Sequence, residues 1–233
     1  MVRFGIDVIP PSSDIEIHDN IITKNYYGIA CYYYGIAIWS FSDTSQQRNI
    51  SIYENIIREN TFGIGEFGDD SIIQIHHNTI SQNEYGIKAR PNYIISENII
   101  TNNSIGISEG AGEVNVIYHN DIRDNDVGLS ILNFLGSEIS ENNFINNHHH
   151  TSVSRSGLLL EAPFQVVLKQ KWSGNYFDDW IKTTPRPILG LWSIYIWFWI
   201  PPGPPSPLRI AVLPYFEFDR HPAQEPYDIP GIC

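Results

Sequence analysis

Isoleucine alternates with polar residues in short runs along the first two thirds of the chain, and these runs recur at a nearly regular spacing. The stretch IIQIHHNTISQNEYGI, residues 72–87, shows one unit: an alternating run, an asparagine, a second asparagine five residues later, and a Gly-Ile pair. The first asparagine of each unit is Asn20, Asn55, Asn78, Asn98, Asn120 and Asn142. Three residues before each of them lies an isoleucine, at Ile17, Ile52, Ile75, Ile95, Ile117 and Ile139.

Apolar positions of period two that are separated by turn residues indicate strands rather than helices. A repeat of about 22 residues is typical of a solenoid. We therefore predict an all-β fold, a right-handed parallel β-helix with about 22 residues and three short strands per coil. Each isoleucine position should form a buried column. The asparagines should lie at corners, where left-handed backbone is tolerated and stacked amides can bond to one another. The glycine eight residues after each of the first five anchors marks a place too tight for a Cβ atom.

The limits of the repeat predict the organisation of the chain. The β-helix should cover residues 1–171, with regular coils from about 5 to 150 and irregular last coils over 151–171. The aromatic and proline-rich segment 172–233 should form a C-terminal cap. Because Gly5 falls within a coil, we expect the first coil edge to be covered by preceding sequence or by another chain. The excursion at 26–49 is either a tolerated insertion or a binding loop.

Composition narrows the possible partners. The formal net charge is −12 and the pI is about 4.9, which disfavours binding to nucleic acid. Cys31 and Cys233 form no disulfide framework. The start MVRFGIDVIPPSS lacks the apolar core of a signal peptide. The apolar run 188–200 is short for a membrane span, so we interpret it as a strand of the cap or as a contact with a membrane interface.

Two groups of histidines are candidates for metal binding. Stacking of the coils should place His77, Glu97 and His119 in a line at about 4.8 Å steps, where they could bind copper or zinc. The alternative is a solvated face in which opposite charges alternate between coils. The second candidate is His148, His149 and His150. Neighbouring side chains on a strand point to opposite faces, so at most two of these three could share an ion.

A carbohydrate-active enzyme, either a polysaccharide lyase or a glycoside hydrolase, is the catalytic alternative. Glu97 and Glu141, two coils apart, could have the carboxylate separation of an inverting glycosidase. Asp178 and Asp179 form another pair, although any acidic β-helix contains such pairs. A non-enzymatic role as a binding protein for polysaccharide or the cell surface is the other possibility, because tyrosine and tryptophan rings can stack on sugars.

Several motifs resemble a known family. The coil sequence ISENIITNNSIGI, residues 95–107, resembles the β-helix repeats of NosD-type proteins, and SGNYFDDW (173–180) and FDRHPAQEPYDI (218–229) are similar to the tail of archaeal NosD-like proteins. The resemblance implies an exported, cell-surface or periplasmic protein without enzymatic activity. It also implies copper as a ligand. The coil motif is specific for the fold more than for the function, because lyases and adhesins share it.

Overall fold

The computed structural model describes residues 4–7, 14–30, 48–65, 71–110, 114–132, 136–158, 170–198 and 206–230. All of the elements in these ranges are β-strands, as predicted, and they form three sheets. The nine-stranded sheet consists of β1 (Phe4–Asp7), β4 (Tyr27–Ala30), β7 (Phe62–Ile64), β10 (Tyr85–Ala89), β13 (Ile105–Glu109), β16 (Val127–Ile131), β19 (His149–Leu158), β22 (Arg186–Phe198) and β23 (Ser206–Asp219).

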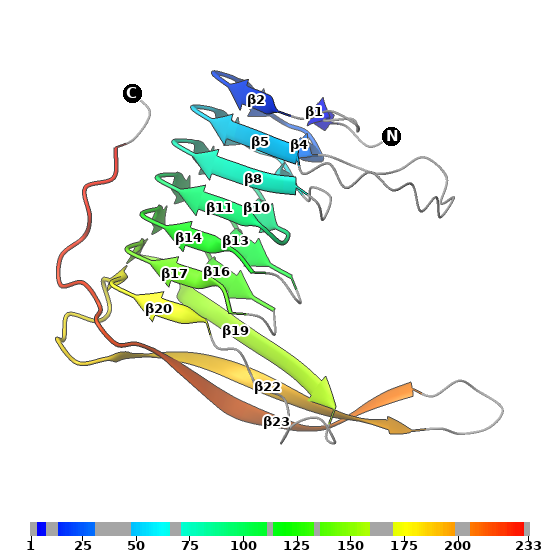
Figure 1. Ribbon diagram of the computed structural model, residues 1–233, viewed down its shortest axis with the longest axis vertical. Helices are drawn as coiled ribbons and strands as arrows, with labels where there is room; N and C mark the ends of the chain where they lie inside the picture. Colours follow the sequence, from blue (N-terminus) through cyan, green and yellow to red (C-terminus); the bar gives the residue numbers. More distant parts are fainter. Residues whose placement is uncertain are drawn as a thin grey trace.

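The other two sheets have seven strands each and complete the coils. One contains β2 (Ile15–His18), β5 (Arg48–Tyr53), β8 (Ser71–His76), β11 (Tyr93–Ser96), β14 (Val116–Tyr118), β17 (Glu138–Ser140) and β20 (Lys171–Ser173). The other contains β3 (Ile21–Thr23), β6 (Ile56–Arg58), β9 (Thr79–Ser81), β12 (Ile99–Thr101), β15 (Asp121–Arg123), β18 (Asn143–Ile145) and β21 (Tyr176–Phe177). Figure 1 shows the coils stacked along the long axis of the molecule.

The predicted isoleucine columns are confirmed. Ile75 pairs with Ile95, and Ile95 pairs with Ile117, in consecutive parallel strands. These three side chains are completely buried, and Ile17 near the first edge is 6% exposed. A fully buried isoleucine contributes roughly 1.5–3 kcal/mol to the free energy of unfolding, so the columns are the main source of stability.

The predicted asparagine ladder is present and runs in one direction. The backbone N–H and the side-chain amide of Asn78 both donate to Oδ1 of Asn98, at 3.0 Å each, and the amide also donates to the carbonyl of Ile52 at 2.8 Å. Asn98 repeats this arrangement with Asn120. Each buried asparagine thus satisfies the backbone of its own corner and binds the next coil.

The backbone at the corners differs from the prediction in one respect. Apart from Asp14 and Asn92, the residues with positive φ lie directly before the ladder asparagines; they include His77 (54°), Glu97 (55°) and His119 (54°). The ladder asparagines themselves are absent from the positive-φ residues of the described chain. At each corner, the asparagine therefore supplies the hydrogen bonds of its amide, and the exposed or half-buried polar residue before it adopts the left-handed conformation.

The coil stack continues beyond residue 172, further than the repeat indicated. Trp172 pairs with Ile139, and Phe177 pairs with Phe144. Asn175 accepts from Asn142 and extends the ladder by one step. Asp219, which is fully buried, ends it by accepting from the backbone and side chain of Asn175 at 2.9 Å each.

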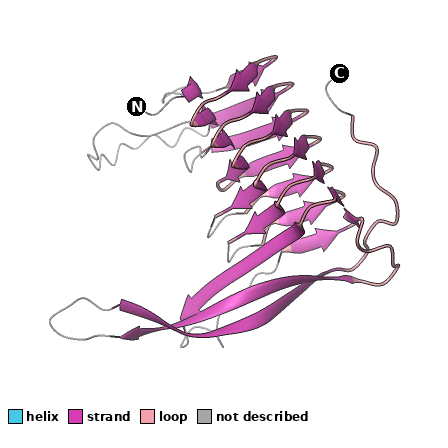
Figure 2. Ribbon diagram, turned by 180° about the vertical axis from the view of Figure 1, so that it is seen from behind, coloured by secondary structure: helices cyan, strands magenta, loops and turns pink. Residues whose placement is uncertain are grey.

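Strands β22 and β23 form an antiparallel hairpin that lies across the end of the stack, as both ribbon views show (Figures 1 and 2). The run predicted at 188–200 thus forms most of β22. The hairpin exposes Leu189, Leu191, Phe216 and Phe218 by about half. The described residues include no helix that is long and apolar enough to cross a membrane. Most of the excursion at 26–49, together with Cys31 and Cys233, lies outside the described residues.

A buried polar network joins the hairpin to the last coils. Arg155 donates to Glu217 at 2.9 Å, and both side chains are at most 2% exposed. The same carboxylate accepts from the Trp172 indole and the Tyr215 hydroxyl at 2.6 Å each. After β23 the chain turns back along the stack, where Tyr227 exchanges hydrogen bonds with the Asn143 side chain.

Candidate metal centre at the end of the coil stack

The candidate site begins with an exception in the glycine column. In each coil up to Gly128, a Cβ atom would approach the carbonyl oxygen of the next coil to 2.3–2.7 Å. At all of these glycines except Gly28, an asparagine side chain of the corner also lies within 3.4 Å of the Cβ position, as Asn147 does at Gly128. His149 pairs with Val127, so His150 follows Gly128 in the column. The series of second asparagines ends in the next coil, where Trp180 lies five residues after Asn175.

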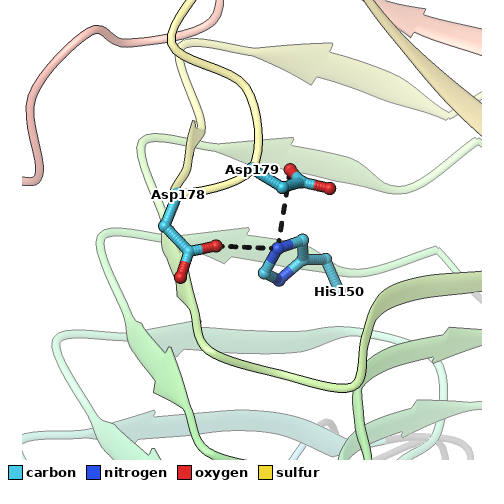
Figure 3. A group of neighbouring side chains, drawn as sticks. All are labelled: His150, Asp178 and Asp179. Atoms are coloured by element: carbon cyan, nitrogen blue, oxygen red, sulfur yellow. Dashed lines mark ion pairs between the residues drawn. The ribbon is translucent and has the colours of Figure 1, made fainter.

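The imidazole of His150 faces two carboxylates from the turn after β21 (Figure 3). Its Nε2 lies 2.9 Å from Oδ1 of Asp178 and 3.5 Å from Oδ1 of Asp179. Three possible ligand atoms, one from each residue, lie within 4.8 Å of one another. In the part of the chain that the structure describes, no other group of three or more histidine, cysteine or acidic side chains brings its possible ligand atoms this close together.

Neighbouring groups hold the two carboxylates in place. The backbone N–H of Asn146 donates to Asp178 at 2.6 Å. The Arg186 guanidinium donates to both oxygens of Asp179 at 3.0 Å and lies over the Phe177 ring, 3.7 Å from its centroid. The site is therefore pre-organised, and Arg186 is the counter-ion that a bound cation would compete with.

The same residues line a pocket of about 500 Å³. His148 and His149 are exposed and contribute to its wall, whereas His150 is only 8% exposed. The three histidines proposed from the sequence thus share one pocket, and His150 alone of them belongs to the convergent group.

Burial lowers the pKa of His150, and Arg186 lowers it further, against the opposing effect of Asp179 and Asp178. In the unfolded chain the ring takes up a proton near pH 6.5, and in the folded protein it does so only at lower pH. We therefore expect the metal-free protein to lose stability as the pH falls below about 6.5 towards the folded pKa, with no contribution from His150 above that pH.

The measurement is the urea midpoint of unfolding in the presence of a chelator, at several pH values between about 7.5 and 5.5. The variant His150→Gln should show a smaller decrease over this range than the wild type. The pKa of His76 is also lowered, first by burial and then by His77, so His76→Gln serves as the comparison for a histidine outside the pocket. An unchanged slope in His150→Gln would contradict the expectation.

The other histidine group lies on the side of the stack, at the corner after the isoleucine column. His77 Nε2 is 2.7 Å from one oxygen of Glu97, and His119 Nδ1 is 4.0 Å from the other. The structure thus places the three residues in consecutive coils, as the repeat required. The carboxylate lies between the two imidazoles, an arrangement that suits alternating charge as well as it suits a metal ion.

The structure gives less support to the alternative of a glycosidase with Glu97 and Glu141 as its two carboxylates. His119 occupies the coil between Glu97 and Glu141, because the Glu97 N–H donates to the His119 carbonyl at 2.9 Å and the His119 N–H donates to the carbonyl of Ser140, next to Glu141, at 3.2 Å. Glu97 is itself paired with His77. A water nucleophile between two free carboxylates, which inversion requires, is not favoured by this arrangement.

Comparison with protein families decides the relationship. The family described as "Periplasmic copper-binding protein (NosD)" matches residues 2–180, more than three quarters of the chain. The chain belongs to the NosD family. The matched segment runs through β21 and ends just after Asp178 and Asp179. Comparisons with curated proteins and with solved structures found no match.

The donor atoms at the end of the stack fit the metal in the NosD description. Imidazole and carboxylate are ligands of Cu(II) and Zn(II), whereas Cu(I) prefers thiolate and thioether sulfur. His150, Asp178 and Asp179 could hold a divalent ion, and the half-open pocket leaves room for further ligands. An ion bound here would supply positive charge in the place where Arg186 now neutralises Asp179.

The repeat identified His150 but did not connect it with Asp178, Asp179 and Arg186. The missing signal was Asn175. If Asn175 is counted as an anchor, Asp178 follows it by three residues and falls in the position that Ile145 has in the preceding coil. His150 lies eight residues after Asn142, so both residues then belong to adjacent coils on one side of the stack.

Proposed function

We propose that this NosD-family protein binds a Cu(II) ion through His150, Asp178 and Asp179, and that it does so outside the cytoplasm. The observation that carries the proposal is the convergence of an imidazole and two carboxylates in a pocket that two more histidines line. The copper-binding and periplasmic description of the family supports both parts of the proposal. The role is binding rather than catalysis.

Metal binding at His150 requires a change in the hydrogen bonds around its imidazole ring. Nδ1 of the ring lies 3.4 Å from the Asn147 amide nitrogen, and Nε2 faces Asp178. An ion bound at Nε2 places the ring proton on Nδ1 and replaces Arg186 as the partner of Asp179. Both changes cost free energy, so the affinity should rise when the competition from Arg186 is removed.

The test is titration of the metal-free protein with Cu(II), followed by calorimetry and electron paramagnetic resonance. We expect the pocket site to show nitrogen coupling from one imidazole, and its affinity to fall by at least about tenfold in His150→Ala and in Asp178→Asn. Arg186→Gln should bind more tightly than the wild type. His221→Ala, which removes an exposed histidine, is the matched control. Equal affinity in His150→Ala and His221→Ala would refute the site.

Binding of polysaccharide receives less support. Tyr27, Phe62 and Tyr85 stack on one another with centroid distances of 5.0 Å and nearly parallel planes. Sugars bind to open aromatic faces. In this column each ring covers the face of the next, so its main effect is to stabilise the stack.

A further inference from the structure

His76 and His77 point to the same side of the chain although they are adjacent. Adjacent side chains on a strand normally point to opposite faces. Here β8 ends at His76, and His77 has a positive φ of 54°, which turns its side chain back towards its neighbour. The two rings are nearly perpendicular, at 86°, and their Nδ1 atoms lie 3.0 Å apart.

The other nitrogen of each ring has its own partner. His76 Nε2 is 3.2 Å from the Ser51 hydroxyl, and its ring stacks on Tyr53 with an angle of 1° between the planes. His77 Nε2 is 2.7 Å from Glu97. A carboxylate or hydroxyl on the far nitrogen is the usual support of a metal-binding histidine, because it fixes both the tautomer and the orientation of the ring.

When both rings are neutral, the two Nδ1 atoms share one proton. In the neutral tautomer whose Nε2–H donates to Glu97, the Nδ1 atom of His77 carries a lone pair. A single proton on His76 Nδ1 then joins the two rings. Two imidazole nitrogens bound in neighbouring positions to one ion, each about 2.0–2.1 Å from it, would be about 2.9 Å apart, which matches the observed separation.

We propose that His76 and His77 form a second metal site, which binds a divalent ion such as Cu(II) through their two Nδ1 atoms in place of the shared proton. Glu97 and Ser51 are positioning residues at this site, and His119 is not a ligand. The remaining coordination positions face solvent, because both rings are only half-buried. The site lies on the side of the coil stack and shares no residue with the pocket at its end.

The experiment uses the full chain with His150→Ala and Asp178→Asn, so that the pocket site is absent. Titration with Cu(II) and electron paramagnetic resonance should show one ion coupled to two nitrogens. His76→Phe, which keeps a ring stacked on Tyr53, and His77→Gln should each abolish the two-nitrogen signal. Glu97→Gln should weaken binding by about tenfold or more and keep the signal, and His119→Ala should change neither.

Three results would overturn the proposal. One is a pocket-deficient protein that binds no copper while the wild type binds one ion. Another is a two-nitrogen signal that survives His76→Phe in protein with an unchanged melting temperature. The third is loss of the signal in His119→Ala, which would indicate a line of ligands across three coils. Failure of the pocket site appears differently, as wild-type binding that His150→Ala leaves intact.

Discussion

Replacing Asn98 by alanine should lower the free energy of unfolding by about 4 kcal/mol, because several buried groups lose their partners and each unpaired one costs about 1–3 kcal/mol. The Asn98 oxygen accepts from the backbone and the side chain of Asn78 at 3.0 Å each. Its amide donates to the carbonyls of Ile75 and Ser96 at 2.8 Å and to Asn120 at 3.0 Å. No water can replace these contacts without opening the corner, since Asn98 is completely buried.

The matched control is Asn102→Ala in the same coil. Asn102 is exposed, has a φ of 55°, and bonds only the neighbouring Thr101 hydroxyl among the contacts given for its side chain. Alanine in the left-handed region costs about 1 kcal/mol. Urea unfolding followed by circular dichroism measures both variants. If they are equally destabilised, the ladder is incidental and the isoleucine columns alone hold the coils in register.

The fold could be predicted because stacking converts a sequence repeat directly into spatial neighbours. Ile75, Ile95 and Ile117 share a position in the repeat, and parallel pairing in register is the arrangement that buries all three. The left-handed backbone was assigned to the wrong corner residue. Asparagine tolerates that conformation, but the ladder needs its amide directed inward, and the preceding polar residue adopts the left-handed conformation instead.

The site could be predicted only in part, because it forms where the repeat ends. His150 departs from the glycine column, and Asp178 and Asp179 lie in a turn that no earlier coil contains. The segment from His150 to Asp178 includes 159–169, which the structure does not describe, and the interval between Asn142 and Asn175 is 33 residues. Without the register of Asn175, nothing in the sequence placed these side chains together.

The end of a solenoid is also the place where a site costs least stability. Inside the stack, a side chain at Gly128 would displace a backbone carbonyl and an asparagine amide of the next coil. The same column carries the His150 side chain one coil later, where it is 8% exposed. His150, Asp178 and Asp179 therefore meet there without interrupting the isoleucine columns or the ladder.

The second large effect concerns the attachment of the hairpin to the last coils. Glu217→Gln should lower the free energy of unfolding by about 3 kcal/mol, in the range expected when one partner of a buried ion pair is removed. Arg155 would then carry its charge beside a neutral amide, with both side chains at most 2% exposed. The new amide nitrogen would also face the Trp172 indole N–H or the Tyr215 hydroxyl, which now donate to carboxylate oxygens at 2.6 Å.

Glu138→Gln is the control, since Glu138 is an exposed glutamate on β17 of the last regular coil. Surface substitutions of this kind change stability by less than about 0.5 kcal/mol. Thermal and urea unfolding, with near-ultraviolet circular dichroism to report on Trp172, should separate the two variants. Because Asp219 ends the asparagine ladder from the same strand as Glu217, loosening of β23 should also expose the last rung at Asn175 to hydrogen exchange. Protection at Asn175 that is the same in both variants would mean that the hairpin covers the stack without stabilising it.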